Sequence, residues 1–298
     1  MRILIIGGSG MLGHKVDQEL NARFETYVTV RGDAARWRRI PQYSGRDTLI
    51  GGIDATRFES IAEVFLRVQP DVVVNCVGVV KQLKEAADPV ISITVNSLFP
   101  HWLAELCGTR GARLIHVSTD CVFSGEKGGY VEEDPSDARD LYGRSKFLGE
   151  VAGTNCLTLR TSIIGRDFNR STGLLEWLIS NRGGKIKGYT GAIYSGFTTL
   201  ALARLIHAVI ADHPGLSGMF HVASRPISKY DLLLKLNEAL GLRIAIERDD
   251  KFHCDRSLRA ERFARLTGLL PPTWEEMIRD LVADPTPYDD LRKIYATS

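Results

Sequence analysis

The chain lacks the features that mark several classes of protein. Its five cysteines are odd in number and form no C-x-x-C pair, which argues against a disulfide framework and a zinc site. No apolar run approaches the roughly 20 residues that span a bilayer. Glycines, and no signal-peptide cleavage site, follow the N-terminal apolar run. We therefore expect a cytoplasmic protein without membrane-spanning segments.

Charge of one sign is not in excess either. The formal net charge of the 298 residues is +2, and 25% of the residues are charged. Such a surface has no global attraction to nucleic acid or to membranes. The seven histidines are scattered without the spacing of metal ligands. We expect neither a nucleic-acid partner nor a bound metal.

The first thirteen residues give the strongest positive signal. The apolar run 2–6 predicts a strand, the segment Gly7–Gly13 follows at once, and Leu12, Val16 and Leu20 then recur at helical spacing. Glycine lets a phosphate approach the backbone because it has no Cβ, and the start of a helix presents unpaired N–H groups. This order predicts a dinucleotide site. A tight turn without a ligand is the simpler alternative.

Strand-like and helical stretches alternate over the first half of the chain. Strands are predicted at 26–30, 48–50, 71–77, 114–117 and 157–160, and helices at 61–68, 95–106 and 142–151. This alternation predicts an α/β fold with a Rossmann-type, doubly wound parallel sheet. We expect a dinucleotide-binding domain over 1–165 and a smaller, partly interleaved C-terminal substrate-binding region over 166–298. Within that region, the segment 188–196 is expected to be loop and the tail from Asp284 to be irregular.

Tyr142 and Lys146 are candidates for chemistry. Four residues apart on a predicted helix, they share one face. An ammonium beside a phenol lowers the pKa of the phenol, which makes it a proton donor or acceptor near neutral pH. Such pairs are common on ordinary helices. A second candidate is Ser118-Thr119-Asp120, at the carboxyl end of a predicted strand, where parallel sheets bind ligands; a turn or a helix cap is the alternative there.

Together these motifs resemble one family. The segments 7–13 and 75–78, Ser118-Thr119-Asp120 and the pair Tyr142 and Lys146 occur in the order of an extended short-chain dehydrogenase/reductase. The segment 118–125 is similar to the S-T-D-x-V-F-x-G of the dTDP-4-dehydrorhamnose reductase family. The segments 134–135, 141–150 and 159–162 match the same group. The resemblance covers about residues 1–165 and is diffuse afterwards.

The resemblance implies a reductase of a nucleotide-linked 4-keto-6-deoxy sugar. Tyr142 would be the general acid, Lys146 would lower its pKa and hold the nicotinamide ribose, and Thr119 would bind the keto oxygen. Asp120 and Ile163, together with Thr119, would meet the sugar. NADP(H) would be the preferred cofactor and NAD(H) the alternative. The residues implied to hold the cofactor are Gly7, Gly10, Met11, Leu12, Gly13, Arg31, Asp54, Cys76, Val77, Gly78, Tyr142 and Lys146.

The preference for NADP(H) depends on the end of the second predicted strand. An arginine there accommodates a 2′-phosphate, whereas an acidic residue pairs with a free ribose hydroxyl. Arg31 stands at this place, with Arg36, Arg38 and Arg39 close behind, although those three also fit a solvated helix face. Asp33 is the counter-indication, because a small shift in register would place it on the ribose.

Two positions bear on the reaction and on the sugar. Related 4,6-dehydratases have Asp-Glu after the threonine, and Cys121 cannot act as that base. Epimerases tend to have Ser-Ser or Ser-Ala there. Rhamnose-type reductases usually have an aromatic residue where this chain has Ile163. A reductase or epimerase of a UDP-linked 4-keto amino sugar stays open, as do a non-catalytic regulatory relative and a homodimeric state.

Overall fold

The computed structural model describes residues 1–81, 83–168 and 173–296. The chain divides into two compact units, each made from several segments. The first unit contains Met1–Ser118, Arg139–Leu159 and Ala203–Met219, and the second contains Thr119–Ala138, Arg160–Leu202 and Phe220–Ser298. The functional boundary that we place at residue 165 stays a prediction.

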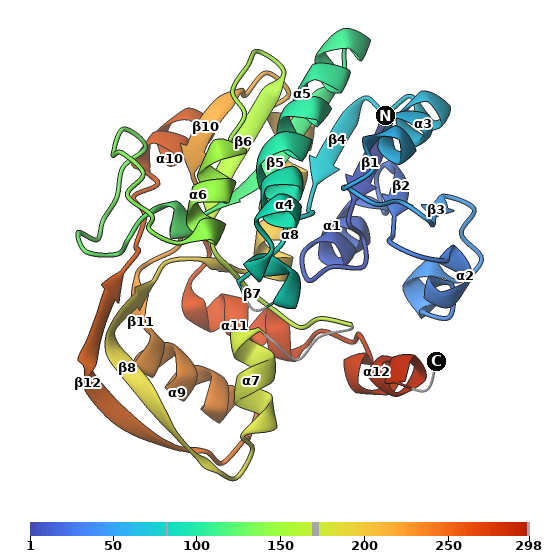
Figure 1. Cartoon of the computed structure of the whole chain (residues 1–298). Coiled ribbons are helices and arrows are strands. Elements are labelled where there is room, and N and C mark those ends of the chain that lie inside the picture. The colour runs from blue at the N-terminus through green and yellow to red at the C-terminus, as the bar shows by residue number, and fades with distance from the viewer. Residues whose placement is uncertain (82, 169–172, 297–298) are drawn as a thin grey trace. The chain divides into compact units, whose positions relative to one another are not determined.

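A seven-stranded sheet forms the centre of the first unit (Figure 1). Its order is β10-β6-β5-β4-β1-β2-β3. The bounds are β1 (Arg2–Ile6), β2 (Glu25–Thr29), β3 (Leu49–Ile50), β4 (Val72–Asn75), β5 (Arg113–Thr119), β6 (Cys156–Thr161) and β10 (Gly218–His221). The pairs β1–β2, β1–β4, β2–β3 and β4–β5 are parallel. Strand order reverses at β1, so the predicted doubly wound α/β fold is confirmed.

Helices cover this sheet, and Figure 1 shows α5 in front of the strands and α8 behind them. The bounds are α1 (Gly13–Leu20), α2 (Ala34–Trp37), α3 (Phe58–Val68), α4 (Pro89–Ile93), α5 (Phe99–Arg110), α6 (Leu141–Leu148) and α8 (Thr199–Asp212). One hydrophobic cluster packs Leu4, Val73 and Leu114 of the strands with Phe65 of α3 and Phe99 of α5. The strands are apolar on both faces because both faces are covered.

The helix predicted at 95–106 is divided in the structure. A π-helical turn, Thr94–Leu98, precedes α5. Pro100 lies in the first turn of α5, where its missing N–H breaks no helical hydrogen bond. Wide turns of this kind are frequent at functional sites, and this one contains Asn96.

The second unit contains two small sheets. The first has the order β11-β8-β12, and the second pairs β7 with β9. The strand bounds are β7 (Ile163–Ile164), β8 (Lys185–Tyr194), β9 (Phe197–Thr198), β11 (Ile227–Ser228) and β12 (Ala245–Asp255). The helices are α7 (Leu174–Ser180), α9 (Lys229–Ala239), α10 (Glu261–Thr267), α11 (Trp274–Val282) and α12 (Tyr288–Ala296). Figure 1 shows α9 within the curve of β8 and β12.

The loop expected at 188–196 is wrong, because residues 188–194 belong to β8. Close packing against neighbouring elements explains the glycines of this segment. A Cβ on Gly188 would lie 2.8 Å from the Tyr230 ring of α9, and a Cβ on Gly191 would lie 2.7 Å from the carbonyl oxygen of Phe252 on β12. Glycine in a strand marks such close approaches as well as turns.

The irregular tail expected from Asp284 is also wrong. Helix α12 begins at Tyr288, directly after Pro287, and proline is well tolerated at a helix start. Tyr288 and Leu291, three residues apart, are buried. Arg166 lies over the Tyr288 ring at 5.0 Å from its centroid. Tertiary packing therefore stabilises a helix that the prolines seemed to exclude.

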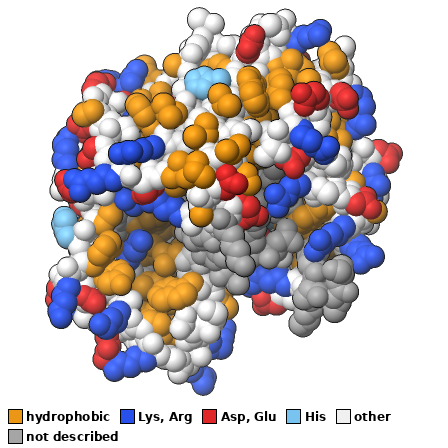
Figure 2. Space-filling view, in the orientation of Figure 1, with side chains coloured by type: hydrophobic (Ala, Val, Ile, Leu, Met, Phe, Trp, Pro, Cys, Tyr) orange, Lys and Arg blue, Asp and Glu red, His pale blue; other side chains and the backbone are white. Residues whose placement is uncertain are grey.

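Among the described residues, no helix has the length and hydrophobicity that a bilayer crossing requires. The same part of the chain has no group of three His, Cys, Asp or Glu side chains that could hold a metal ion. On the face shown in Figure 2, basic and acidic side chains are interspersed.

Candidate active site

The glycine-rich turn connects β1 to α1, and its positions require glycine for different reasons. Gly7 has φ +92°, and a Cβ there would lie 2.8 Å from Val77 Cγ2. A Cβ on Gly13 would overlap the carbonyl oxygen of Gly7. Gly10 is different, because its Cβ would meet only that same oxygen, at 3.3 Å. Among the described residues no other atom beyond the chain neighbours of Gly10 lies within 4 Å of that position, so this side of the turn is accessible beside the start of a helix, as a cradle for the pyrophosphate of a dinucleotide requires.

Arg31 is exposed two residues beyond β2, at the carboxyl edge of the sheet. Asp33, the counter-indication for a 2′-phosphate, has a local role. Its Oδ1 accepts the N–H of Ala35 at 2.8 Å and caps the start of α2. This hydrogen bond occupies part of the carboxylate that would otherwise face a ribose.

Asp54 follows β3 on the same edge of the sheet and is partly buried. Its Oδ1 accepts the N–H of Thr56 at 2.9 Å and the Thr56 hydroxyl at 2.8 Å. Burial alone would raise the pKa of Asp54, but these hydrogen bonds and the charges of Arg31 and Arg57 outweigh it, so the pKa is lowered. Asp54 is therefore a carboxylate at neutral pH.

The segment Cys76–Gly78 leaves β4 as a turn that two buried amides hold. Asn75 Oδ1 accepts the N–H of Val77 at 3.1 Å. Asn96, in the π-helical turn, accepts the Val79 N–H at 2.9 Å through Oδ1 and donates through Nδ2 to the Val79 carbonyl at 3.0 Å. Asn75 and Asn96 thus fix the backbone that follows β4.

Helix α6 carries Tyr142 and Lys146. Lys146 is buried, and its Nζ donates to the carbonyl oxygen of Val117 at 2.9 Å. Val117 lies near the carboxyl end of β5. Burial lowers the pKa of Lys146 to about 8, although the charge of Glu150 acts in the opposite direction. The helix is thus fixed to the carboxyl end of β5 through one of the two residues predicted for catalysis.

Lys81 is a cation near Tyr142 that the sequence did not indicate. Its Nζ lies 5.7 Å from the centroid of the Tyr142 ring and 2.6 Å from Asp140 Oδ2. Asp140 in turn caps α6 by accepting the N–H of Gly143 at 2.8 Å. Lys81 lies about sixty positions earlier in the chain, in the connection that follows β4, so no local pattern could have shown this contact.

Thr119, Asp120 and Ile163 belong to the second unit. Thr119 Oγ1 lies 3.2 Å from Asp120 Oδ1 and accepts the N–H of Cys121 at 3.1 Å. Burial raises the pKa of Asp120, against the lowering effect of the Arg256 charge. Ile163 pairs with Phe197 through β7 and β9. Thr119 is also the last residue of β5, two positions after the carbonyl that Lys146 contacts.

A parallel, doubly wound sheet with a glycine-rich turn after its first strand defines an α/β protein of the dinucleotide-binding class. A model of the RmlD substrate binding domain family matches residues 1–286. The chain belongs to this family, which confirms the resemblance to extended short-chain dehydrogenases/reductases.

Individual relatives agree with this assignment. The chain is 31% identical over 236 residues to a probable dTDP-4,6-dihydroxy-2-methyloxan-3-one 4-ketoreductase of Streptomyces antibioticus, covering 75% of this chain and 72% of that protein. A hypothetical dTDP-4-dehydrorhamnose reductase from Sulfolobus tokodaii has a similar structure, with a TM-score of 0.76, 26% identity, and 92% and 98% coverage of the two chains. The dTDP-4-dehydrorhamnose reductase of Bacillus anthracis, solved in complex with NADP, has a TM-score of 0.77, 21% identity, and 95% and 98% coverage.

Proposed function

We propose that this protein is an NADPH-dependent reductase of the 4-keto group of a nucleotide-linked 4-keto-6-deoxy sugar. The observation that carries the proposal is the buried Lys146, one helical turn after Tyr142 and hydrogen-bonded to the end of β5. An ammonium is costly to bury, and such groups concentrate at functional sites. The named ketoreductase of Streptomyces antibioticus supports the same reaction class.

The cofactor would be held by the edge of the sheet at which β1, β2, β3 and β4 end. The open space at Gly10 suits the pyrophosphate, and the N–H groups of Met11, Leu12 and Gly13 lie at the start of α1. Arg31 would pair with a 2′-phosphate. The turn Cys76–Gly78 would contact the adenosine ribose, and Asp54 would accept a hydrogen bond from the adenine amino group.

When bound, the reduced nicotinamide supplies the hydride for C4 of the sugar. The chain's own residues would protonate the keto oxygen and stabilise its developing charge. Tyr142 would donate its phenolic proton to the forming alkoxide, and Thr119 would donate a hydrogen bond to the same oxygen. Lys146 would stabilise the phenolate that remains and would bind the nicotinamide ribose. Asp120 would accept a hydrogen bond from a neighbouring sugar hydroxyl, and Ile163 would pack against the ring.

The preference for NADPH over NADH rests on two observations. Arg31 is exposed beyond β2, and Asp33 already accepts a hydrogen bond from the backbone of α2. The Bacillus anthracis relative, whose structure contains NADP, supports the same cofactor.

The test is cofactor oxidation by the purified protein, followed by the loss of the absorbance of the reduced nicotinamide, with dTDP- and UDP-linked 4-keto-6-deoxy sugars and with NADPH and NADH in parallel. We expect stoichiometric consumption of NADPH and a product with a hydroxyl at C4, identified by NMR. A protein that keeps its cofactor bound and consumes none while it isomerises the sugar would be an epimerase, and the proposal would be wrong.

A further inference from the structure

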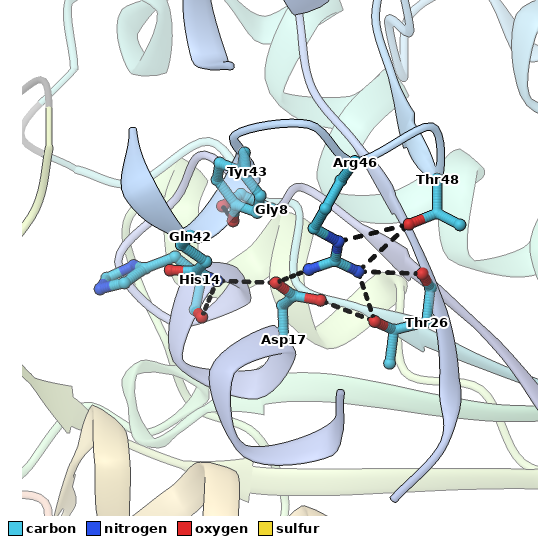
Figure 3. Close-up of polar contacts among 8 residues, drawn as sticks. All are labelled: Gly8, His14, Asp17, Thr26, Gln42, Tyr43, Arg46 and Thr48. Atoms are coloured by element: carbon cyan, nitrogen blue, oxygen red, sulfur yellow. Dashed lines mark hydrogen bonds and ion pairs between the residues drawn. The ribbon is translucent and has the colours of Figure 1, made fainter. Parts of the chain in front are cut away.

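The connection between α2 and β3 folds back onto the glycine-rich turn (Figure 3). Tyr43, in this connection, is fully buried, and its hydroxyl donates to the carbonyl oxygen of Gly8 at 2.7 Å. The N–H of Gly8 donates to the carbonyl of Thr29 at 2.8 Å. A Cβ on Gly8 would overlap Cγ1 of Val28. Gly8 is therefore in contact with three residues. Val28 and Thr29 belong to β2, whereas Tyr43 reaches the Gly8 carbonyl from the connection between α2 and β3.

A buried polar network fixes the position of this connection (Figure 3). Asp17 of α1 is fully buried, and its Oδ2 lies 2.7 Å from both Arg46 Nη1 and Gln42 Nε2. Its Oδ1 accepts the Thr26 hydroxyl of β2 at 2.8 Å. Gln42 also donates to the carbonyl of His14 at 2.9 Å. The residues on either side of Tyr43 are thus fastened to the same helix whose start follows the glycine-rich turn.

The direction of one peptide unit follows from the contact between Tyr43 and Gly8. The structure has no cis peptide bond in the part of the chain that it describes. In a trans peptide the carbonyl and the following N–H point in opposite directions. Because the Gly8 carbonyl points to the buried Tyr43 hydroxyl, the N–H of Ser9 points away from it. Ser9 is half-buried and adjoins Gly10, where the open space of the turn lies.

We propose that Tyr43 is a positioning residue for dinucleotide binding, which holds the Gly8–Ser9 peptide so that the Ser9 N–H is directed at a phosphate of the cofactor. The inference rests on the proposed use of NADPH as cofactor. It adds Ser9 as a phosphate donor and makes the connection between α2 and β3 a brace of the cofactor site. Preorganised N–H groups bind phosphate more tightly than groups that must first be ordered.

The experiment measures the dissociation constants of NADPH and NADH for the purified protein by titration calorimetry, with no sugar present. Tyr43→Phe keeps the ring and removes the hydroxyl. We expect both dissociation constants to rise by about 3- to 10-fold, the effect of one hydrogen bond. The ratio of the two constants should not change, because the phosphates adjoining the glycine-rich turn are common to both cofactors.

Two control variants separate positioning from general damage to the fold. Tyr27→Phe makes the same chemical change in β2, where the hydroxyl donates to Glu25 at 2.6 Å. Ser44→Ala removes an exposed hydroxyl next to Tyr43 in the same connection, outside the network of Asp17, Gln42 and Arg46. Both variants should bind NADPH and NADH with the constants of the unchanged protein.

Each result decides the question. Unchanged constants for Tyr43→Phe, a change for one cofactor alone, or an equal loss in Ser44→Ala would overturn the positioning role. If Tyr43→Phe unfolds in the assay, NMR of the unchanged protein replaces it: the amide proton of Ser9 must shift when NADPH binds, and an unaffected Ser9 amide would overturn the role. If the unchanged protein binds neither cofactor, the proposed function itself fails and the inference fails with it.

Discussion

Lys146 makes the stability of this protein depend on pH in a direction that the structure fixes. Burial lowers its pKa from the ordinary value of 10.5 to about 8. Between these two values the unfolded chain holds a proton that the folded protein has released. Raising the pH from about 8 to 10.5 therefore stabilises the folded protein, and lowering it over the same range removes that gain. A shift of this size changes the free energy of unfolding by roughly 3 kcal/mol across this pH range.

Lys146→Met isolates this effect because methionine has a similar length and no titrating group. The variant also loses the hydrogen bond to the Val117 carbonyl, but that loss is independent of pH. We expect the free energy of unfolding of the unchanged protein, relative to that of the variant, to be about 2–3 kcal/mol higher at pH 10 than at pH 7. Urea unfolding at four pH values, followed by tryptophan fluorescence, measures this difference. A difference that stays constant with pH would show that the Lys146 ammonium is not buried, and the reasoning about its environment would be refuted.

The remaining variants address the cofactor, the keto oxygen and the brace. Arg31→Ser should raise the KM for NADPH by about 10-fold, the loss of one charge-assisted contact, and leave the KM for NADH unchanged; equal effects on both would contradict a 2′-phosphate contact. Thr119→Val should lower kcat by about 100-fold, the effect of one missing donor to a developing oxyanion, with the dissociation constant of NADPH unaltered. Asp17→Asn removes the buried negative charge that pairs with Arg46 and should lower the free energy of unfolding by about 3 kcal/mol, measured by urea unfolding; a change below about 1 kcal/mol would rule out a strong pair.

The elements of the first unit could be predicted because their sequence signals are local. An apolar run that ends at Gly7 and a valine run from Val72 each predict a buried strand without information from elsewhere in the chain. Pro100 suits a first helical turn and not a helix interior, and it lies in the first turn of α5. The strand ends then place Arg31 and Asp54 on one edge of a parallel sheet.

The second unit was harder to predict because its segments depend on distant partners. Strand β8 contains glycines that predict loop when considered alone, and only the ring of Tyr230 and the backbone of Phe252 show why a side chain is excluded there. Helix α12 likewise depends on the stacking of Arg166 on Tyr288. Periodicity within a window cannot show contacts between residues that lie 42 positions apart (Gly188 and Tyr230), still less 122 (Arg166 and Tyr288).

The candidate site also contains residues that the sequence indicates and residues that it does not. Glycines, Tyr142 and Lys146 have characteristic spacings, so the sequence indicates them. Tyr43 and Lys81 have no such spacing: a lone tyrosine in a connection and a lone lysine in a loop are common in any chain. Their roles follow only from where the hydroxyl and the ammonium lie, 2.7 Å from the Gly8 carbonyl oxygen and 5.7 Å from the centroid of the Tyr142 ring.

The central claim is that Tyr142 delivers the proton in a reduction of a nucleotide-linked 4-keto sugar. The most direct measurement is single-turnover oxidation of NADPH by Tyr142→Phe and by the unchanged protein, with the best substrate of the dTDP- and UDP-sugar series. We predict that the variant, with NADPH at saturation, reduces the sugar at least about 100-fold more slowly, the contribution expected of a general acid. Turnover at the unchanged rate would contradict the account.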